Sequence, residues 1–184
     1  MSKARKTPGS VKISKPVLAE LNEGTRETAN LAEGLAVDFV ALIRTVIPQV
    51  SAEALKTFNV GQPSITERMT RGGQLLLATP KIDLEALAEH SSDTIRGIVA
   101  YALCLEEGVT FANRLTQLRP LANDAHFGVR EWAWLALRPH IVADIKTALK
   151  LLEPWVHEEE FYLRRFAVEA TRPRGVWSAH INAL

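Results

Sequence analysis

The chain has 184 residues, of which 47% are hydrophobic and 23% charged, and its formal net charge is +1. These proportions are typical of a globular domain with a sizeable core, and no apolar run approaches the roughly 18 residues of a membrane span. We therefore expect no membrane partner. The single cysteine, Cys104, lies in an apolar stretch, which predicts a buried side chain and a cytoplasmic protein without disulfides.

The first 24 residues form a basic segment without the apolar core of a secretory signal. We interpret residues 1–24 as a flexible arm, which is either a solvated tail or a segment that contacts phosphate groups. Residues 25–184 are predicted to form one domain. The charge of the arm comes from Lys3, Arg5, Lys6, Lys12 and Lys15.

Helical periodicity runs through nearly all of the sequence after Leu21, and β-branched runs are scarce, so the expected fold class is all-α. Ser51 and Ser64 are predicted to cap two short helices. Before them, one long helix that ends at Pro48 is expected to bury Leu31, Leu35, Phe39, Leu42, Ile43 and Val46 on one face. After Pro80 the pattern predicts helix pairs: 83–89 with 93–106, 111–121 with 127–137, and 141–155 with 159–171.

The second half of the chain repeats itself with a period of about 34 residues, a length typical of solenoid repeats. Residues 127–139 recur as residues 161–173, with Phe, Arg, Ala, Ala, Arg and Pro in the same places. One period earlier, Arg96 and Ala102 keep the register. In solenoids, stacked units bury a core that no unit could bury alone. The sequence therefore predicts an α-solenoid of HEAT-like helix pairs.

Residues 127–138, placed on a helix, separate a buried stripe from a polar face. Trp132 is assigned to the stripe, whereas Arg130, Trp134 and Arg138 follow one another on the polar face. An aromatic ring between two guanidinium groups suits DNA, because arginine can hold phosphates while a nucleotide rests on the ring. The next repeat and the segment after it are predicted to extend this DNA-binding track through Arg164, Arg165, Arg172, Arg174 and Trp177.

Several of these arginines have a structural alternative. Asp124 and Glu158 precede Arg130 and Arg164 by six residues, and such acid–arginine pairs form a ladder between turns in HEAT-type repeats. Arg138 and Arg172 precede prolines at predicted helix ends, where a cation also complements the helix dipole. Each arginine therefore has two candidate roles, one in the fold and one at a phosphate.

No catalytic constellation follows from spacing alone. The histidines show no metal-ligand pairing, and there is no glycine-rich phosphate loop, so neither a metal nor a cofactor is expected. Glu131 and Glu169 lie among the arginines of the polar face. Each is an ion-pair partner or, alternatively, a group that stabilises positive charge or activates water at a sugar carbon.

Residues 124–134 and 166–177 resemble the bacterial DNA alkylation repair family, the AlkC/AlkD-like HEAT-repeat glycosylases. The likeness is closest to the AlkC branch, through a Glu-x-x-Arg-Pro-Arg…Trp run at Glu169–Trp177 and an early element at residues 30–38. The resemblance implies excision of cationic alkylated bases, such as 3-methyladenine or 3-methylcytosine, from duplex DNA. It also implies that Glu169 stabilises charge on the lesion sugar. Trp134 stands where the family pattern has a second glutamate, and Glu131 is the substitute.

The sequence thus predicts a DNA-binding HEAT-like repeat protein that, if active, hydrolyses the N-glycosidic bond of cationic alkylated bases. The alternative is a module that binds DNA or protein and has lost the chemistry, which the tryptophan at position 134 favours. The end of the chain carries Trp177, Ile181 and Leu184, an apolar set suited to self-association.

Overall fold

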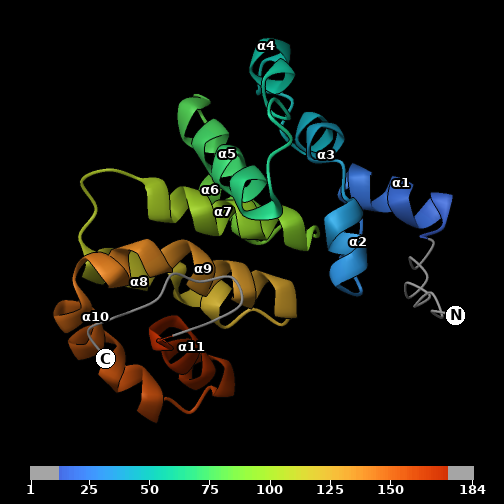
Figure 1. The fold of residues 1–184 in the computed structure, drawn as a ribbon. Helices are drawn as coiled ribbons and strands as arrows, with labels where there is room; N and C mark the ends of the chain where they lie inside the picture. Colours follow the sequence, from blue (N-terminus) through green and yellow to red (C-terminus); the bar gives the residue numbers. More distant parts are fainter. Residues whose placement is uncertain (1–12, 174–184) are drawn as a thin grey trace, which may run out of the picture.

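The computed structural model describes residues 13–173, and all regular structure in this range is helical (Figure 1). The predicted all-α class is therefore confirmed for the described residues. The first half of the chain contains α1 (Lys15–Glu23), α2 (Leu31–Ala36), α3 (Phe39–Val46), α4 (Ala52–Lys56) and α5 (Ile65–Ala78). The second half contains α6 (Leu84–Ala88), α7 (Asp93–Leu105), α8 (Phe111–Ala122), α9 (Phe127–Ala143), α10 (Ile145–Leu152), the 3-10 helix η1 (Glu153–His157) and α11 (Phe161–Thr171).

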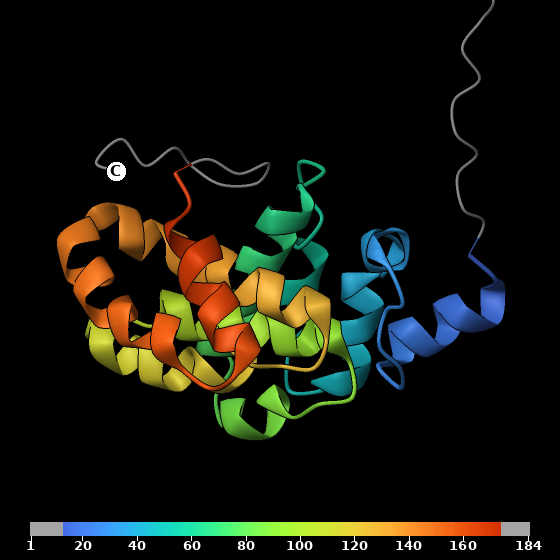
Figure 2. The same ribbon diagram turned by 90° about the horizontal axis from the view of Figure 1, so that it is seen from below.

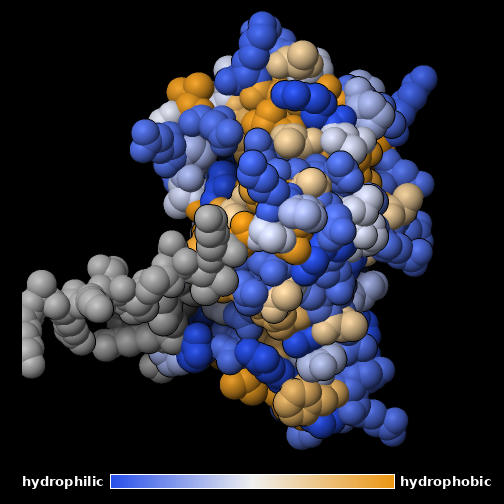
Figure 3. All heavy atoms as spheres, turned by 90° about the vertical axis from the view of Figure 1, so that its right-hand side faces the viewer, coloured by the Kyte–Doolittle hydropathy of each residue, from blue (hydrophilic) through white to orange (hydrophobic). Residues whose placement is uncertain are grey.

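Helix α7 lies at the centre of the molecule, with α5 packed on one side and α9 on the other (Figures 1 and 2). Every α7 residue from Asp93 to Cys104 is buried. Helix α11 packs on α9 in turn, so that α5, α7, α9 and α11 follow one another across the molecule. The face seen in Figure 3 shows only small, separate hydrophobic patches, because the apolar side chains are gathered between these helices.

The close approach of α5, α7 and α9 depends on glycine. A Cβ atom at Gly73 would lie 2.8 Å from the backbone nitrogen of Ala102. At Gly97 it would lie 2.6 Å from both Met69 Cε and Trp132 Cδ1. Glycine within a helix costs about 1 kcal/mol relative to alanine, so these positions are weak points of single helices. They are retained here because they let neighbouring helices come into contact.

The prediction of one long helix before Pro48 is wrong. Asp38 interrupts it, because its side chain accepts hydrogen bonds from the first backbone N–H groups of α3 and starts a new helix there. Asn30 caps α2 separately. As a result, Leu31 and Leu35, which were expected to face the core, are 59% and 47% exposed.

Residues 15–23, which the sequence assigned to a flexible arm, form α1. Proline in the first turn favours a helix start, and Leu21 is buried where α1 packs on α3. Gly24 ends the helix with a left-handed φ of 76°. Several predicted features lie outside the described residues: residues 1–12 of the arm, the DNA-binding candidates Arg174 and Trp177, and the apolar Ile181 and Leu184.

Three arginines at equivalent positions of successive sequence repeats make the same hydrogen bond. Nη1 of Arg96, Arg130 and Arg164 donates to the backbone carbonyl six residues earlier, at 2.7, 2.6 and 2.6 Å. In the last two, the same nitrogen also lies 2.8 Å from the following carbonyl oxygen. The bonds fix the loop that leads into α7, α9 and α11, which explains why arginine recurs at the repeat spacing.

We expect Gly97→Ala to lower the free energy of unfolding by about 1–3 kcal/mol, because the added methyl group overlaps Met69 and Trp132. Gly34→Ala is the matched control. Its Cβ atom would meet nothing closer than 3.9 Å, so stability should stay unchanged or rise by up to about 1 kcal/mol. Urea denaturation followed by circular dichroism measures both variants, and equal stabilities would contradict the packing described for α7.

Candidate functional site

The structure reverses the predicted roles of two tryptophans in α9. Trp134, expected on an exposed polar face, is only 3% exposed beneath α11, and its Nε1 donates to Glu131 Oε2 at 3.0 Å. Trp132, expected in the core, is partly exposed and lines a pocket. The prediction that Trp134 lies on the surface is therefore wrong, and a ring buried in this way cannot stack on a nucleotide.

Arg138 was also predicted to lie on the exposed face, and it is buried instead. Its Nη1 and Nη2 donate to the backbone carbonyls of Ala170 and Arg172, at 2.8 and 2.5 Å. Burial, together with the nearby charge of Arg172, lowers the pKa of the Arg138 guanidinium. This side chain fastens the end of α11 to α9, and it is not free for phosphate contact.

Arg130 and Arg164 fit the structural alternative, in a modified form. Among the described residues they bind backbone carbonyls, and the carboxylates expected to pair with them bind other arginines: Asp124 lies 2.8 Å from Arg96 and Glu158 lies 2.7 Å from Arg119. The guanidinium of Arg130 also lies 3.8 Å from the centre of the Tyr162 ring. Both arginines therefore support the fold with contacts that a phosphate would have to displace.

Four charged side chains form what we call the charged row: Glu131 of α9, Arg165 and Glu169 of α11, and Arg172, which directly follows α11. Arg165 Nη2 donates to Glu131 Oε1 at 2.9 Å, and Arg165 Nε lies 3.9 Å from Glu169 Oε1. Arg172 Nη1 lies 3.1 Å from Glu169 Oε2. The four side chains are between 21% and 44% exposed, so solutes can reach them. The structure thus brings together both predicted carboxylates and two of the predicted arginines.

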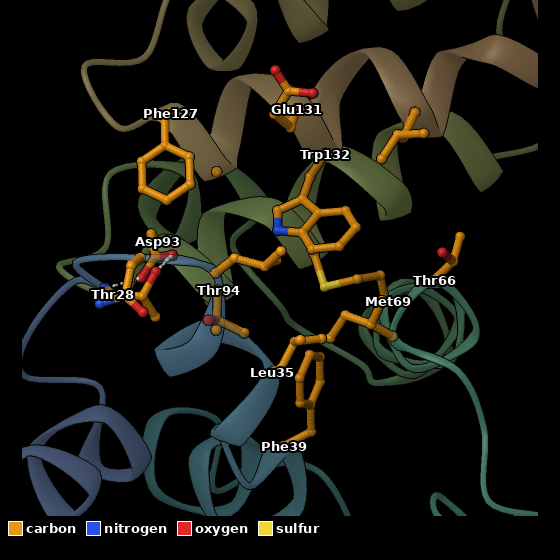
Figure 4. A pocket seen from close by; sticks show the side chains of 16 residues that line it. Thr28, Leu35, Phe39, Thr66, Met69, Asp93, Thr94, Phe127, Glu131 and Trp132 are labelled. Atoms are coloured by element: carbon orange, nitrogen blue, oxygen red, sulfur yellow. Dashed lines mark hydrogen bonds between the residues drawn. The ribbon is translucent and has the colours of Figure 1, made fainter. Parts of the chain in front are cut away.

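A pocket of about 260 Å³ lies beside the charged row, between α2, α5, α7 and α9, and we call it the aromatic pocket. Figure 4 shows Trp132 and Phe127 reaching into it from α9, with Met69 and Phe39 on the facing elements. Glu131 lines the pocket as well as the row. The lining is mainly apolar. Apart from Glu131, its ionisable member is Asp93, and no lysine, arginine or histidine belongs to the described lining.

Asp93 belongs to a buried polar junction that holds the wall of the pocket. Its carboxylate accepts hydrogen bonds from the backbone N–H and hydroxyl of Thr28, at 2.9 and 2.8 Å (Figure 4). The carbonyl of Thr28 accepts a hydrogen bond from His126 Nε2 at 2.7 Å, and His126 Nδ1 accepts one from the backbone N–H of Gly128. His126 Nδ1 also lies 3.5 Å from Asp93 Oδ2, so the imidazole at the start of α9 joins this junction.

Arg96 completes the junction from the other side. The buried guanidinium of Arg96 binds Glu27, which precedes Thr28 in loop 24–30, at 2.5 Å and Asp124 at 2.8 Å. Burial opposes the charge on Arg96, but the hydrogen bonds to Asp124 and Glu27 outweigh it and raise the pKa of the guanidinium. Loop 24–30 is thereby held against the starts of α7 and α9, which keeps α2 in place over the pocket.

Trp132, Phe127 and Asp93 were not predicted as residues of a site. Trp132 has the spacing of a core residue and carries no separate signal. Asp93 does carry one, because it stands one repeat before Phe127, where the later repeats have phenylalanine. Of the three equivalent positions 93, 127 and 161, position 93 alone carries a charged residue, and it lies at the start of α7.

Within residues 13–173, no three histidine, cysteine, aspartate or glutamate side chains gather closely enough to hold a metal ion. None of the helices in that range has the length and apolar character needed to cross a membrane. Comparisons with protein-family models, curated proteins and solved structures give no match for this chain. Function must therefore be inferred from the residues and their geometry.

We expect Arg96→Gln to lower the free energy of unfolding by about 3–5 kcal/mol, because it leaves the largely buried Asp124 carboxylate without its cation. Arg26→Gln is the matched control on the same loop. Arg26 is partly exposed and binds Glu20 and Glu33 at 3.4 and 3.5 Å, so its loss should cost less than about 1 kcal/mol. Chemical denaturation measures both, and a similar loss in the two variants would contradict the role of the junction.

Proposed function

We propose that this protein is an α-solenoid of HEAT-like helix pairs that binds duplex DNA and hydrolyses the N-glycosidic bond of a cationic alkylated base. The arginine-to-carbonyl hydrogen bonds, which recur at the repeat spacing, support the solenoid. The resemblance to alkylation-repair glycosylases supports the reaction. The aromatic pocket and the charged row supply the groups that the reaction needs.

One observation carries the proposal: the aromatic pocket holds two carboxylates and no cation among its described lining residues. The faces of the Trp132 and Phe127 rings attract a planar cation, and the attraction grows when the site is partly dry. Asp93 is buried and pairs with none of the described lysines or arginines; its basic neighbour among the described residues is His126, whose Nδ1 lies 3.5 Å from Asp93 Oδ2. A positively charged base therefore suits the pocket better than a neutral or anionic ligand of the same shape.

The size of the pocket agrees with a single base. Its volume of about 260 Å³ lies just below the range of roughly 300–1,000 Å³ for typical small-molecule sites. A planar ring that enters between Trp132 and Phe127 would lie close to Glu131, which borders the pocket.

The chemistry balances with these groups. When the glycosidic bond breaks, its electron pair moves to the alkylated base, which leaves as a neutral molecule, and positive charge passes to the sugar. Water then bonds to the sugar carbon and gives up a proton, which a neighbouring carboxylate accepts and returns to the solvent. We assign the stabilising carboxylate to Glu131, because Glu131 borders the pocket, whereas Glu169 does not belong to its lining. Glu169 then holds Arg165 and Arg172 in position.

Contact with the DNA backbone is assigned to Arg165 and Arg172, the predicted arginines that remain exposed among the described residues. Both lie in ion pairs with the carboxylates of the row. Phosphate groups can exchange with such partly exposed carboxylates, since ion pairs at the surface are worth at most about 1 kcal/mol. When a DNA phosphate binds Arg165, it would take the place of Glu131, and the Glu131 carboxylate would then be free to face the sugar.

The same ion pairs favour a second candidate, a DNA-binding module without the chemistry. Arg165 lies 2.9 Å from Glu131, and a carboxylate neutralised in this way stabilises a developing cation less. Arg130, Arg138 and Arg164 are also engaged in structural contacts, which leaves a smaller basic surface than the sequence predicted. This module would bind alkylated duplex DNA and release no base.

Incubation with duplex DNA that contains 3-methyladenine or 3-methylcytosine should release the free base. Glu131→Gln should slow the release by roughly 100-fold or more, because the amide cannot stabilise the sugar cation or accept a proton. Glu53→Gln, on the exposed surface of α4, is the control and should release base at the wild-type rate. Binding without release by the wild type would select the non-catalytic module.

Affinity for duplex DNA should fall as salt rises, and Arg165→Gln should weaken it. Removing one arginine–phosphate interaction should reduce the slope of log affinity against log salt concentration by about 0.9. Arg44→Gln, an exposed arginine on α3, should leave both the affinity and the slope unchanged. An unchanged slope for Arg165→Gln would remove the charged row from the DNA interface, and no salt-dependent affinity at all would remove DNA as the partner.

A further inference from the structure

Helix α2 turns one face toward the aromatic pocket, and the middle of that face has no side chain. Leu31, Gly34 and Leu35 all line the pocket, and their spacing of i, i+3 and i+4 places them on one side of the helix. Figure 4 shows Leu35 across the pocket from Phe127 and Trp132. Because Gly34 has no side chain, a gap lies between the two leucines, and we call this gap the glycine notch.

The packing of the helices does not explain the glycine at position 34. A Cβ atom would lie 2.6–3.1 Å from its nearest neighbour at each of the other glycines in the described helices, which are Gly72, Gly73, Gly97 and Gly128. At Gly34 the nearest neighbour of an added Cβ is Thr28 Oγ1, at an ordinary contact distance of 3.9 Å. Glycine is also a poor helix former, so alanine would favour α2 more. The space that Gly34 leaves in the pocket is the remaining reason for a glycine there.

The notch lies next to the anionic side of the pocket. Thr28 Oγ1, the atom that a side chain at position 34 would meet first, donates a hydrogen bond to Asp93 at 2.8 Å. The proton of this hydroxyl is therefore already used, and the two residues that flank the notch on α2 are leucines. An apolar group suits such a place because it needs no hydrogen bond, and a positive charge next to it would lie near a carboxylate.

We propose that the glycine notch receives the alkyl group of the cationic base and limits its size. This inference rests on the proposed function, in which such a base enters the aromatic pocket. The ring of the base lies against Trp132, and its N-alkyl group lies at Gly34. The alkylated nitrogen, around which the positive charge of the ring is spread, then comes near Asp93. Contact with the ligand would also cover Leu31 and Leu35, which are 59% and 47% exposed.

Two nucleosides that differ by one carbon test this role, 3-methylcytidine and 3-ethylcytidine, both cations at neutral pH. Wild-type protein should bind the two with affinities within a few-fold of each other. Gly34→Ala should weaken the binding of 3-ethylcytidine by roughly tenfold or more and that of 3-methylcytidine much less, since one methyl group in a closed apolar site is worth about 10–200-fold. The methyl group of the alanine takes the place of the second ethyl carbon. Calorimetric titration measures all four affinities.

Gly34→Leu should lower the affinity for both nucleosides by roughly tenfold or more, because the larger side chain fills the notch. Ala36→Leu is the matched control, since it enlarges an exposed residue of the same helix that does not belong to the described lining of the pocket. It should leave both affinities at the wild-type value. Urea denaturation should find the position-34 variants at least as stable as wild type, because alanine and leucine are good helix formers.

The outcomes separate the notch from the pocket itself. Unchanged binding by Gly34→Leu, an equal loss of the two nucleosides in Gly34→Ala, or a similar loss in Ala36→Leu would overturn the notch and leave the base pocket standing. If wild-type protein binds neither nucleoside, the pocket assigned in the proposed function fails, and the notch fails with it. The Gly34→Ala comparison decides the question even if Gly34→Leu is poorly folded.

Discussion

The hydrogen bond from an arginine guanidinium to the backbone carbonyl six residues earlier fixes the loops that lead into α7, α9 and α11, on which the rest of the structure depends. Arg96, Arg130 and Arg164 each make it, and each sets the entry to a central helix. Arg96 adds the pairs with Glu27 and Asp124, so the same side chain also holds the loop before α2. Holding this loop against the starts of α7 and α9 keeps α2 over the aromatic pocket, and the packing of α11 on α9 brings the charged row together.

Much of the fold could be predicted from the sequence, because helix caps and a repeat are local signals. Helices α8 and α11 lie close to their predicted ranges, whereas α9 continues through Pro139 to Ala143, where the sequence predicted a break and a new helix from residue 141. The site could not be predicted in the same way. A helical wheel shows that α9 has two faces, but α7 covers one and α11 covers the other, so Trp134 and Arg138 are buried too. Only the packed structure shows that Trp132 borders open space.

The proposed reaction depends on the charges around Glu131. This carboxylate is shared between Trp134, Arg165 and the wall of the pocket, and a carboxylate has enough lone pairs to serve more than one donor. A cation in the pocket would find Asp93 below it and Glu131 at the border. If Glu131 stays paired with Arg165, the protein is a binding module, and if Glu131 turns to the sugar, it is an enzyme. DNA phosphates compete with Glu131 for Arg165 and can therefore release this carboxylate.

The most direct test of the pocket is a titration with 3-methylcytidine, a cation at neutral pH, and with uncharged cytidine, followed through the tryptophan indole N–H signals by NMR. We predict that the cation shifts the Trp132 signal at lower concentration than cytidine does. The signal of Trp155, which is buried against Phe166, should stay in place. Equal effects of the two nucleosides, or a Trp132 signal that neither moves, would contradict a pocket selective for a cationic base.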